Sequence, residues 1–193
     1  MKLIGVAGTN GSGKDTVGDM LAERHGFLFV SVSDLLRQEA KKRGLPIERQ
    51  VLRTISAEWR REFGLGVLVD KAIEQYKLGD YDGLVAIPMR NVGEAQHLKE
   101  LGGTLVWVDA DPGVRYDRIW GRQRTAEDDK TFEEFLAEEQ TEMHHSGDSA
   151  TLNVAGVKKL CDIFLENDGH DIEVFKNEAD EQLARLLSHR HHT

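Results

Sequence analysis

The 193-residue sequence has little of what several classes of protein need. Its single cysteine, Cys161, rules out an internal disulfide and favours a reducing, cytoplasmic setting. Its apolar runs are all shorter than the ~20 residues that cross a bilayer, and the first of them is too short for the core of a signal peptide. Basic residues are outnumbered, 25 against 34 acidic ones, and the net charge of −9 argues against a nucleic-acid-binding surface. We therefore expect neither nucleic acid nor a membrane as partner, and any polyanion site must be local.

What the chain does have is the composition of a globular protein, 39% hydrophobic and 31% charged. This length fits one domain, or one domain with a modest insertion. Short β-branched segments alternate with amphipathic ones, which is typical of a parallel sheet covered by helices on both faces. The predicted strands span residues 3–7, 27–32, 84–87, 104–108 and 162–165. The predicted helices span residues 16–24, 34–42, 48–63, 67–76, 92–101, 113–121, 132–144 and 177–187.

The clearest motif is the segment Gly8-Thr9-Asn10-Gly11-Ser12-Gly13-Lys14, between the first predicted strand and the first predicted helix. In that context, glycines let successive backbone N–H groups converge on phosphate oxygens, and the helix N-terminus adds a favourable dipole. Lys14 supplies positive charge to the β- and γ-phosphates. The motif predicts a site for a nucleoside triphosphate, with ATP as the expected ligand. The residues expected to bind it are Gly8, Asn10, Gly11, Ser12, Gly13, Lys14, Asp15 and Thr16.

Asp15 stands where many phosphate-binding loops carry a Ser or Thr that reaches Mg²⁺, and the hydroxyl follows at Thr16. This Gly-x-Gly-Lys-x-Thr ending resembles the P-loop of adenylate kinase and related nucleoside monophosphate kinases. The resemblance implies an α/β fold of the P-loop kinase type, a three-layer sandwich in which a five-stranded parallel sheet has helices on both faces and a short lid. It also implies that Thr16 contacts Mg²⁺ or a phosphate.

The second predicted strand leads into Ser31-Val32-Ser33-Asp34-Leu35-Leu36-Arg37. This segment resembles Ser-Thr-Gly-Asp-Leu-Leu-Arg of the same kinases, which implies that Ser31 and Arg37 hold a phosphorylated acceptor. An arginine here can grip a phosphate bidentately and orient its attacking oxygen. Asp34 is placed to hold Mg²⁺ through water or to orient the attacking group. The alternative is that Ser33 or Asp34 only caps a helix and Arg37 is a surface charge.

The third predicted strand ends in Leu84-Val85-Ala86-Ile87-Pro88-Met89-Arg90. It resembles the Asp-Gly-Phe-Pro-Arg segment of adenylate kinases, and the Asp-Gly-Ile-Arg segment followed by Glu of dephospho-CoA-kinase-like proteins. The resemblance implies acceptor-binding roles for Arg90 and Glu94. The aspartate has no counterpart, because Ala86 or Ile87 occupies its place. The carboxylates expected near the strand ends that can replace it are Asp15, Asp34 and Asp109.

Asp117-Arg118-Ile119-Trp120-Gly121-Arg122 resembles the start of the kinase lid, whose arginines cover the transferring phosphoryl group. The resemblance implies that Arg118, Arg122 and Arg124 stabilise the developing charge from a short lid at about residues 122–131. The alternative is a basic turn that complements a helix dipole. On the next predicted helix, the acidic residues are expected to form a solvated surface; they are Glu133, Glu134, Glu138, Glu139 and Glu142.

Asn167 follows the fifth predicted strand, in a loop that is similar to the one near the adenine of ATP in dephospho-CoA kinases. The resemblance implies that Asn167 borders the base, although a turn at the strand end explains it equally well. The helical stretch 44–78 is longer than a simple crossover requires, and it is predicted to be an insertion that covers the acceptor side.

Together these motifs predict one P-loop kinase domain over residues 1–193, acting as a monomer or homodimer. The expected activity is transfer of the γ-phosphoryl group of ATP, with Mg²⁺, to a nucleoside or deoxynucleoside monophosphate. Two alternatives stay open: a dephospho-CoA-kinase-like enzyme, and a non-catalytic nucleotide-binding regulator or plain NTPase. The residues predicted to be catalytic are Lys14, Asp34, Arg118 and Arg122, and those predicted to hold the metal are Thr16 and Asp34.

Overall fold

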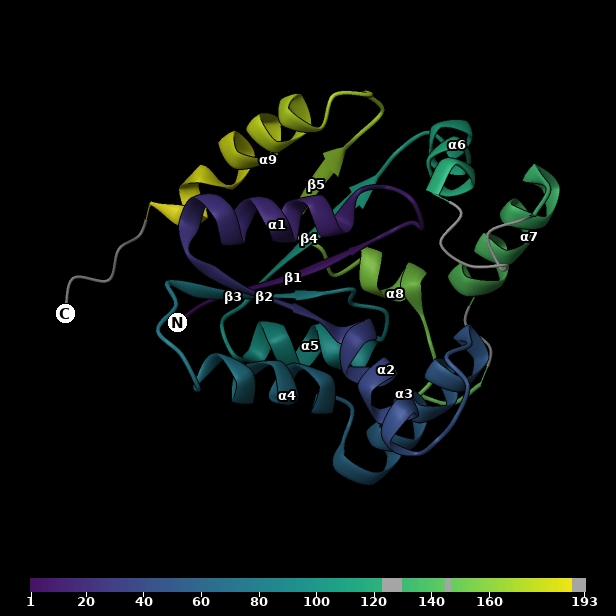
Figure 1. The fold of residues 1–193 in the computed structure, drawn as a ribbon. Helices are drawn as coiled ribbons and strands as arrows, with labels where there is room; N and C mark the ends of the chain where they lie inside the picture. The colour runs from purple at the N-terminus through teal and green to yellow at the C-terminus, as the bar shows by residue number, and fades with distance from the viewer. Residues whose placement is uncertain (123–129, 145–146, 189–193) are drawn as a thin grey trace.

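The computed structural model describes residues 1–122, 130–144 and 147–188. Five strands form one parallel sheet in the order β2-β3-β1-β4-β5 (Figure 1). The strands are β1 (Lys2–Gly8), β2 (Phe27–Ser31), β3 (Gly83–Ile87), β4 (Thr104–Asp109) and β5 (Ile163–Glu166). This arrangement, with helices on both faces of the sheet, confirms the predicted fold class.

Helices cover both faces of the sheet and its carboxyl edge. One face carries α1 (Lys14–His25) and α9 (Ile172–Leu187), which lie side by side (Figure 1). The opposite face carries α2 (Val32–Lys42), α3 (Arg49–Phe63), α4 (Val67–Tyr76), α5 (Val92–Glu100) and α8 (Val154–Lys158). The remaining two, α6 (Pro112–Arg122) and α7 (Phe132–Met143), stand near the carboxyl ends of the strands.

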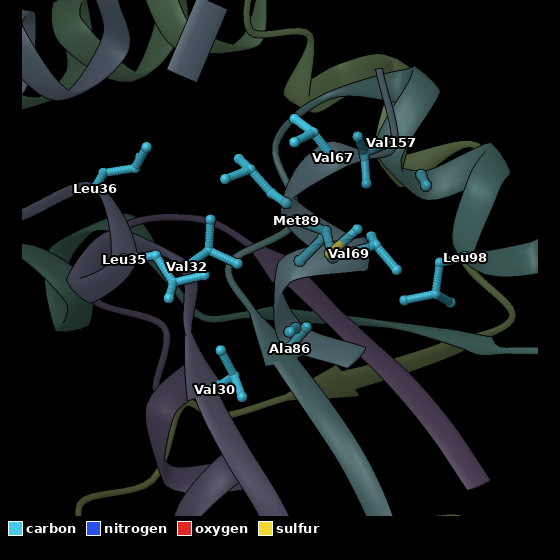
Figure 2. Close-up of a cluster of buried hydrophobic side chains, with 14 of the residues drawn as sticks. Val30, Val32, Leu35, Leu36, Val67, Val69, Ala86, Met89, Leu98 and Val157 are labelled. Atoms are coloured by element: carbon cyan, nitrogen blue, oxygen red, sulfur yellow. The ribbon is translucent and has the colours of Figure 1, made fainter. Parts of the chain in front are cut away.

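The central strand β1 shows why the strand sequences are continuous apolar runs rather than alternating apolar and polar residues. Its side chains point in turn to the two faces, and both faces are covered. Leu3 packs into the cluster under α4 and α5, part of which Figure 2 shows, whereas Ile4 packs into the cluster under α1 and α9. Burying each such side chain contributes about 1.5–3 kcal/mol.

The parallel register places the functional loops at one edge. β1 pairs with β3 and with β4, so that Gly8 lies opposite Val108, and Ser31 at the end of β2 lies opposite Ile87. The segments that follow the strands therefore begin beside one another. In open parallel sheets, ligands bind at this edge.

Two helices differ from the sequence-based expectation by more than two residues. Helix α8 was not predicted, because a five-residue helix shows too little periodicity; Asn153 caps it by accepting a hydrogen bond from the Gly156 N–H. Helix α9 begins at Ile172 rather than at residue 177, because Asp171 accepts hydrogen bonds from the N–H groups of Glu173 and Val174.

The stretch predicted as an acceptor-side insertion contains α3 and α4. Most of the predicted lid, 123–129, lies outside the described residues. Among the helices of the described ranges, none combines the length and the apolar character that crossing a membrane requires.

Candidate active site

The phosphate-binding loop connects β1 to α1, and its backbone explains its glycines. Gly11 and Gly13 adopt φ angles of 80° and 95°, which side chains other than glycine rarely tolerate. A Cβ atom on Gly13 would lie 2.5 Å from the Nδ2 atom of Asn167. Helix α1 then begins at Lys14, and the first N–H groups of a helix have no acceptor within the helix. The loop can therefore direct backbone donors toward an anion.

The Lys14 side chain is buried over this loop. Its ammonium group donates a hydrogen bond to the carbonyl oxygen of Thr9 at 2.5 Å, and the Ser12 hydroxyl donates to the same oxygen at 2.9 Å. Burial, and then the nearby charge of Arg90, lower the pKa of Lys14 to about 7. An anion placed beside this ammonium group would stabilise its charged form strongly, because little water is present to do so.

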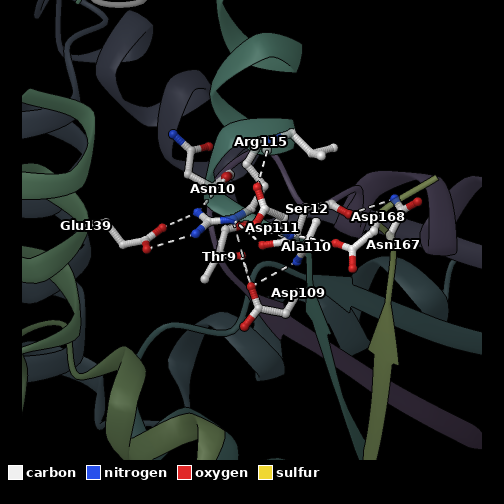
Figure 3. A network of polar contacts seen from close by, with 12 residues as sticks. Thr9, Asn10, Ser12, Asp109, Ala110, Asp111, Arg115, Glu139, Asn167 and Asp168 are labelled. Carbon is white, nitrogen blue, oxygen red and sulfur yellow. Dashed lines mark hydrogen bonds and ion pairs between the residues drawn. The ribbon is translucent and has the colours of Figure 1, made fainter. Parts of the chain in front are cut away.

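Asp109, at the end of β4, supports the loop from behind. Its carboxylate accepts hydrogen bonds from the Thr9 hydroxyl at 2.7 Å and from the Ala110 N–H at 2.9 Å (Figure 3). Burial alone would raise the pKa of Asp109, but these hydrogen bonds outweigh burial and lower it. The sequence offered Asp109 as a substitute for the missing carboxylate of the third strand; the structure instead engages it in holding the loop.

Two residues predicted to bind nucleotide from separate motifs meet at the loop. The Asn167 side-chain amide donates to the carbonyl oxygen of Ser12 at 2.8 Å (Figure 3). The Arg118 guanidinium donates to the carbonyl oxygens of Asn167 at 2.8 Å and of Gly11 at 3.4 Å. The loop, the α6 helix and the turn after β5 therefore form one wall.

The sequence analysis did not identify Arg115, which lies one turn before Arg118 on α6, as a site residue. Its buried guanidinium donates to the carbonyl oxygens of Ala110 at 2.8 Å and Asn10 at 3.3 Å, and it forms a two-pronged ion pair with Glu139 of α7 (Figure 3). The available signal was its spacing of three residues from Arg118, which places both on one side of the helix. Arg122 lies in the last turn of α6 with its side chain outside the described part, and Arg124 lies outside the described residues altogether.

Next to the loop lies a cleft of about 600 Å³ that contains most of the predicted polar groups. Lys14, Thr16 and Asp34 all line it. Ser31 lines it too, and its hydroxyl accepts a hydrogen bond from the Asp34 N–H at 3.2 Å, which caps α2. The Asp34 carboxylate accepts a hydrogen bond from Arg37 at 2.6 Å.

The cleft offers the hard oxygen donors that Mg²⁺ prefers. They are the Thr16 hydroxyl and the carboxylates of Asp15, Asp19 and Asp34. Within the described ranges, no three carboxylate, histidine or cysteine side chains form a complete metal cage. This donor set fits Mg²⁺, which usually binds to one or two protein groups and completes its shell with water and substrate phosphates.

A second cavity of about 210 Å³ adjoins the cleft and shares Arg37, Arg49 and Arg90 with it. Arg53 and Arg60 complete a set of five arginines along its wall. Aliphatic side chains also line it, namely Val32, Leu36, Leu52, Leu68 and Leu152. Pro88 and the polar side chains of Asn10, Ser33, Ser56 and Glu142 complete the wall. The arginines predicted from the second and third strands are thus brought together, although they are 53 positions apart in the sequence.

Three of these arginines come from one stripe of α3 that the sequence reading overlooked. Arg49, Arg53 and Arg60 recur at intervals of four and seven residues, which places them on one side of a helix. Ile55 and Trp59 of the same helix pack into the core. The apolar periodicity of this helix was recognised, but the basic stripe beside it carries the signal for the cavity.

Helix α7 supplies Glu142 to Arg53 of the cavity and Glu139 to Arg115, so the prediction that its acidic side chains are a solvated surface was wrong for these two. The Glu139 and Glu142 side chains are only 17% and 19% exposed. Glu142 accepts a hydrogen bond from Arg53 at 2.5 Å and lies 3.7 Å from Arg90. Burial alone would raise the pKa of Glu142, but Arg90 and Arg53 outweigh it and lower the pKa.

Glu94, predicted to bind the acceptor, lies beneath Arg60. The two side chains are 1% and 3% exposed, and their closest atoms, Glu94 Oε1 and Arg60 Nη2, are 2.6 Å apart. Arg60 also donates to the carbonyl oxygen of Ala150 at 2.9 Å. Burial raises the pKa of Glu94 despite the neighbouring guanidinium. Glu94 therefore holds a wall residue of the cavity in place from behind.

Comparison with known proteins agrees with this architecture. A family model described as an AAA domain matches residues 4–143, well over half of the chain. The chain belongs to this AAA domain family. Over 188 residues it is 30% identical to a UPF0200 protein of Pyrobaculum aerophilum, and the match covers 96% of the chain and 99% of that protein. A UPF0200 protein of Hyperthermus butylicus is 30% identical over 185 residues, covering 95% of the chain and 94% of that protein.

Solved structures similar to this AAA domain include small-molecule kinases. The shikimate kinase of Acinetobacter baumannii, determined with shikimate, matches with a TM-score of 0.60 and 15% identity, covering 99% of this chain and 96% of that one. A gluconokinase of Sinorhizobium meliloti matches with a TM-score of 0.54 and 20% identity, covering 96% and 93%. These likenesses show the P-loop kinase fold, which is a nucleotide-binding fold.

Proposed function

We propose that the protein is an ATP-dependent phosphotransferase that transfers the γ-phosphoryl group to a small-molecule acceptor already carrying an anionic group. One observation carries this proposal: the cleft of Lys14 and the arginine-lined cavity adjoin and share Arg37, Arg49 and Arg90. A nucleotide on the loop and an anionic acceptor in the cavity would meet at these guanidinium groups.

These positions give each residue a role in the proposed reaction. Lys14 and the backbone of the loop would bind the β- and γ-phosphates, and Arg118 and Asn167 would line the nucleotide side. Arg37 and Arg90 would hold the acceptor so that its oxygen attacks the γ-phosphorus in line with the bond to ADP that breaks. Thr16 and Asp34 would hold Mg²⁺, which supplies charge neutralisation on the phosphates when it is bound.

The two classes of acceptor predicted from the sequence remain candidates under this proposal. Nucleoside monophosphates are favoured by the resemblance of residues 31–37, and dephospho-CoA by the short lid, Glu94 and the Asn167 loop. A second candidate function is a nucleotide-binding regulator without catalysis. It is favoured by one observation, the apolar pair Ala86 and Ile87 at the end of β3, where a carboxylate would assist the metal.

Coupled measurement of ADP release with ATP, Mg²⁺ and a panel of acceptors tests the proposal. We expect at least one phosphorylated acceptor to raise the rate well above the basal ATPase rate, and Lys14→Ala to remove this increase. Lys41→Ala, which changes an exposed lysine on α2, is the matched control and should retain it. Retained ATP binding with acceptor-independent turnover would contradict the kinase assignment and support the regulator or a plain NTPase.

A further inference from the structure

Helix α7 places one of its carboxylates, that of Glu142, inside the arginine-lined cavity. We infer that this carboxylate occupies the guanidinium groups of the cavity in the ligand-free protein and leaves them when an anion binds there. The contact is then autoinhibitory. The inference rests on the proposed function for the identity of the acceptor site, but binding of inorganic phosphate tests it without any transfer step.

The Glu142 side chain is held as a bound anion would be. It accepts a hydrogen bond from Arg53 at 2.5 Å and lies 3.7 Å from Arg90. Arginine donors bind the oxygens of a carboxylate and of a phosphate in the same way. Arg90 also lines the Lys14 cleft, and the proposed reaction gives it the acceptor. Glu142 and an incoming anion therefore need the same donors.

Glu142 differs from the other carboxylates that neutralise the cavity wall. Each of the five arginines of the wall contacts a carboxylate, as Arg37 does with Asp34 and Arg60 with Glu94. In the described part of the chain, however, Glu142 is the one carboxylate that lines the cavity itself. The others support the arginines from outside, whereas Glu142 lies where a ligand would lie.

The two anions repel each other if both stay. A phosphate oxygen that binds the same Nη1 atom of Arg90 would lie within about 7 Å of the Glu142 carboxylate, given the 3.7 Å contact and an ordinary hydrogen bond. Glu142 is only 19% exposed, so little water screens the like charges. Protonation does not relieve the repulsion at neutral pH, because Arg90 and Arg53 lower the pKa of Glu142. The carboxylate relieves it by moving away.

The space between α7 and the phosphate-binding loop is small as well. A gap of only about 20 Å³ remains there, which holds about one water molecule. It is bordered by residues 8–10 of the loop, by Arg49 and Arg90, and by Glu138, Glu139 and Glu142 of α7. On this side of Arg90, an anion larger than water enters only if side chains of α7 move.

Helix α7 is anchored ahead of its last turn. Phe135 is buried and packs against the Tyr116 ring, and Glu139 forms the two-pronged ion pair with buried Arg115 (Figure 3). Glu142 follows three residues later, one residue before the helix ends at Met143. Helix ends open locally at a lower cost than helix middles. Glu142 can therefore leave the cavity while the anchored part of α7 stays in place.

The contact lowers the affinity of the cavity for an anion. Only molecules in which Glu142 has left the guanidinium groups can bind, so the apparent affinity falls in proportion to their fraction. Loss of a partly exposed ion pair shifts such an equilibrium by about two- to fivefold. In return, the clustered guanidinium groups keep a partner of opposite charge when the cavity is empty.

Hydrogen exchange measured by mass spectrometry tests the displacement on the full chain, with inorganic phosphate as the probe and without nucleotide. Phosphate should speed exchange of the amides of residues 140–144 by about two- to fivefold, because the last turn loses its ion pair. Residues 132–136 are the internal reference and should not change, because a capping box of Thr131 and Glu134 holds that end. The response should persist in Lys14→Ala, which weakens the loop as a phosphate site but leaves the cavity intact.

Glu142→Gln imitates the displaced state. Its last turn should exchange faster without phosphate, and phosphate should add little further increase, because the two perturbations break the same contact. Phosphate itself should bind more tightly. Glu133→Gln, exposed on the same helix, is the matched control and should behave as the unmodified protein does. Equal circular dichroism and melting of both variants ensure that a folding defect is not mistaken for displacement.

Slower or unchanged exchange of the last turn with phosphate would overturn the inference, because α7 would then hold the ligand or ignore it. Phosphate binding that is weaker or unchanged in Glu142→Gln, or absent from both proteins, would overturn it too. None of these results decides the kinase proposal, which ADP release tests. Displacement of Glu142 by phosphate, with no acceptor raising ADP release, would support the inference and count against the kinase proposal.

Discussion

The phosphate-binding loop and the acceptor cavity lie side by side, but they are built in different ways. The loop is made of nine consecutive residues, 8–16, whose backbone is proposed to do most of the binding, and three of its glycines have φ angles that side chains rarely adopt. The cavity is made of single side chains from α2, α3, α4, α7, the loop and the segments after β3 and α7. A site built from backbone groups can therefore be recognised from one local sequence motif, whereas a site built from side chains depends on how distant helices pack.

The largest expected effect concerns the stability of the cavity wall. Glu94→Ala leaves Arg60 charged and buried, and should lower the free energy of unfolding by ~3–5 kcal/mol in a urea titration. Replacing both residues by methionine should recover most of this loss, because no charge then remains buried without a partner. The exposed pair of Arg61 and Asp148 is the control, and Arg61→Ala should lower the free energy of unfolding far less, because water screens that pair. Equal costs for the two single changes would contradict the role of Glu94 in the wall.

Gly13→Ala tests the backbone site. It introduces a Cβ atom 2.5 Å from the Asn167 side chain at a positive φ angle, and we expect a loss of ATP affinity on the order of 100-fold, comparable to the effect of a 1 Å misplacement in a catalytic site. Gly44→Ala separates the two causes, because Gly44 also has a positive φ, but a Cβ atom there would meet no other atom within 4 Å. It should cost only ~1 kcal/mol of stability and leave ATP affinity unchanged. Calorimetric titration with ATP measures the affinity of both variants, and urea unfolding measures their stability. Normal ATP affinity in Gly13→Ala would contradict the role of the loop.

The pH dependence of ATP binding tests Lys14, which lines the cleft beside the loop. Its pKa of about 7 means that the ammonium form disappears as pH rises above 7, and phosphate binding requires that form. ATP affinity should therefore fall above pH 7, by at most about tenfold per pH unit. Calorimetry between pH 6.5 and 8.5 measures this slope, and Lys14→Met should bind weakly with no such slope.

The same group has the opposite effect on stability. In the unfolded chain Lys14 stays protonated up to its ordinary pKa of 10.5, whereas the folded protein releases the proton from about pH 7. The unfolded state thus binds more protons between these values, so the contribution of Lys14 to the free energy of unfolding rises with pH across that window. The cost of burying its charge is fully present below pH 7. A Lys14→Met protein with an unchanged pH dependence of stability would argue against this shift.

The smallest expected effect comes from the carboxylate inside the cavity. Glu142→Gln removes a negative charge beside Arg53 and Arg90, and should tighten binding of inorganic phosphate by about two- to fivefold. Affinity for ATP on the loop should change little. Glu133→Gln, exposed on the same helix, is the control and should change neither. Weaker phosphate binding in Glu142→Gln would indicate that this carboxylate positions the arginines rather than competing with the ligand.

The same contrast explains what could be predicted from the sequence. The strands and helices follow from local periodicity and the loop from its glycine motif. Arg37 and Arg90 were predicted because their segments resemble those of nucleoside monophosphate kinases and dephospho-CoA-kinase-like proteins. Arg118 and Asn167 were found through local segments as well, and the structure brings them to the loop.

Arg53, Arg115 and Glu142 were not found. Helical spacing places Arg53 beside Arg49 and Arg115 beside Arg118, but the contacts that define their roles form only where α3, α6 and α7 pack together. Glu94 was recognised as notable but given a different role, because its partner Arg60 is 34 positions away on another helix. Long-range ion pairs were thus the main information that the sequence reading lacked.

Following the phosphorus atoms during turnover tests most directly whether the loop and the cavity act together. ³¹P nuclear magnetic resonance of the full chain with ATP, Mg²⁺ and the phosphorylated acceptor that most increases ADP release should show the coupled signals of a diphosphate product growing together with those of ADP, and Lys14→Ala should abolish both. Growth of ADP with inorganic phosphate alone, at the same rate with and without the acceptor, would contradict the claim that the loop and the cavity form one phosphotransfer site.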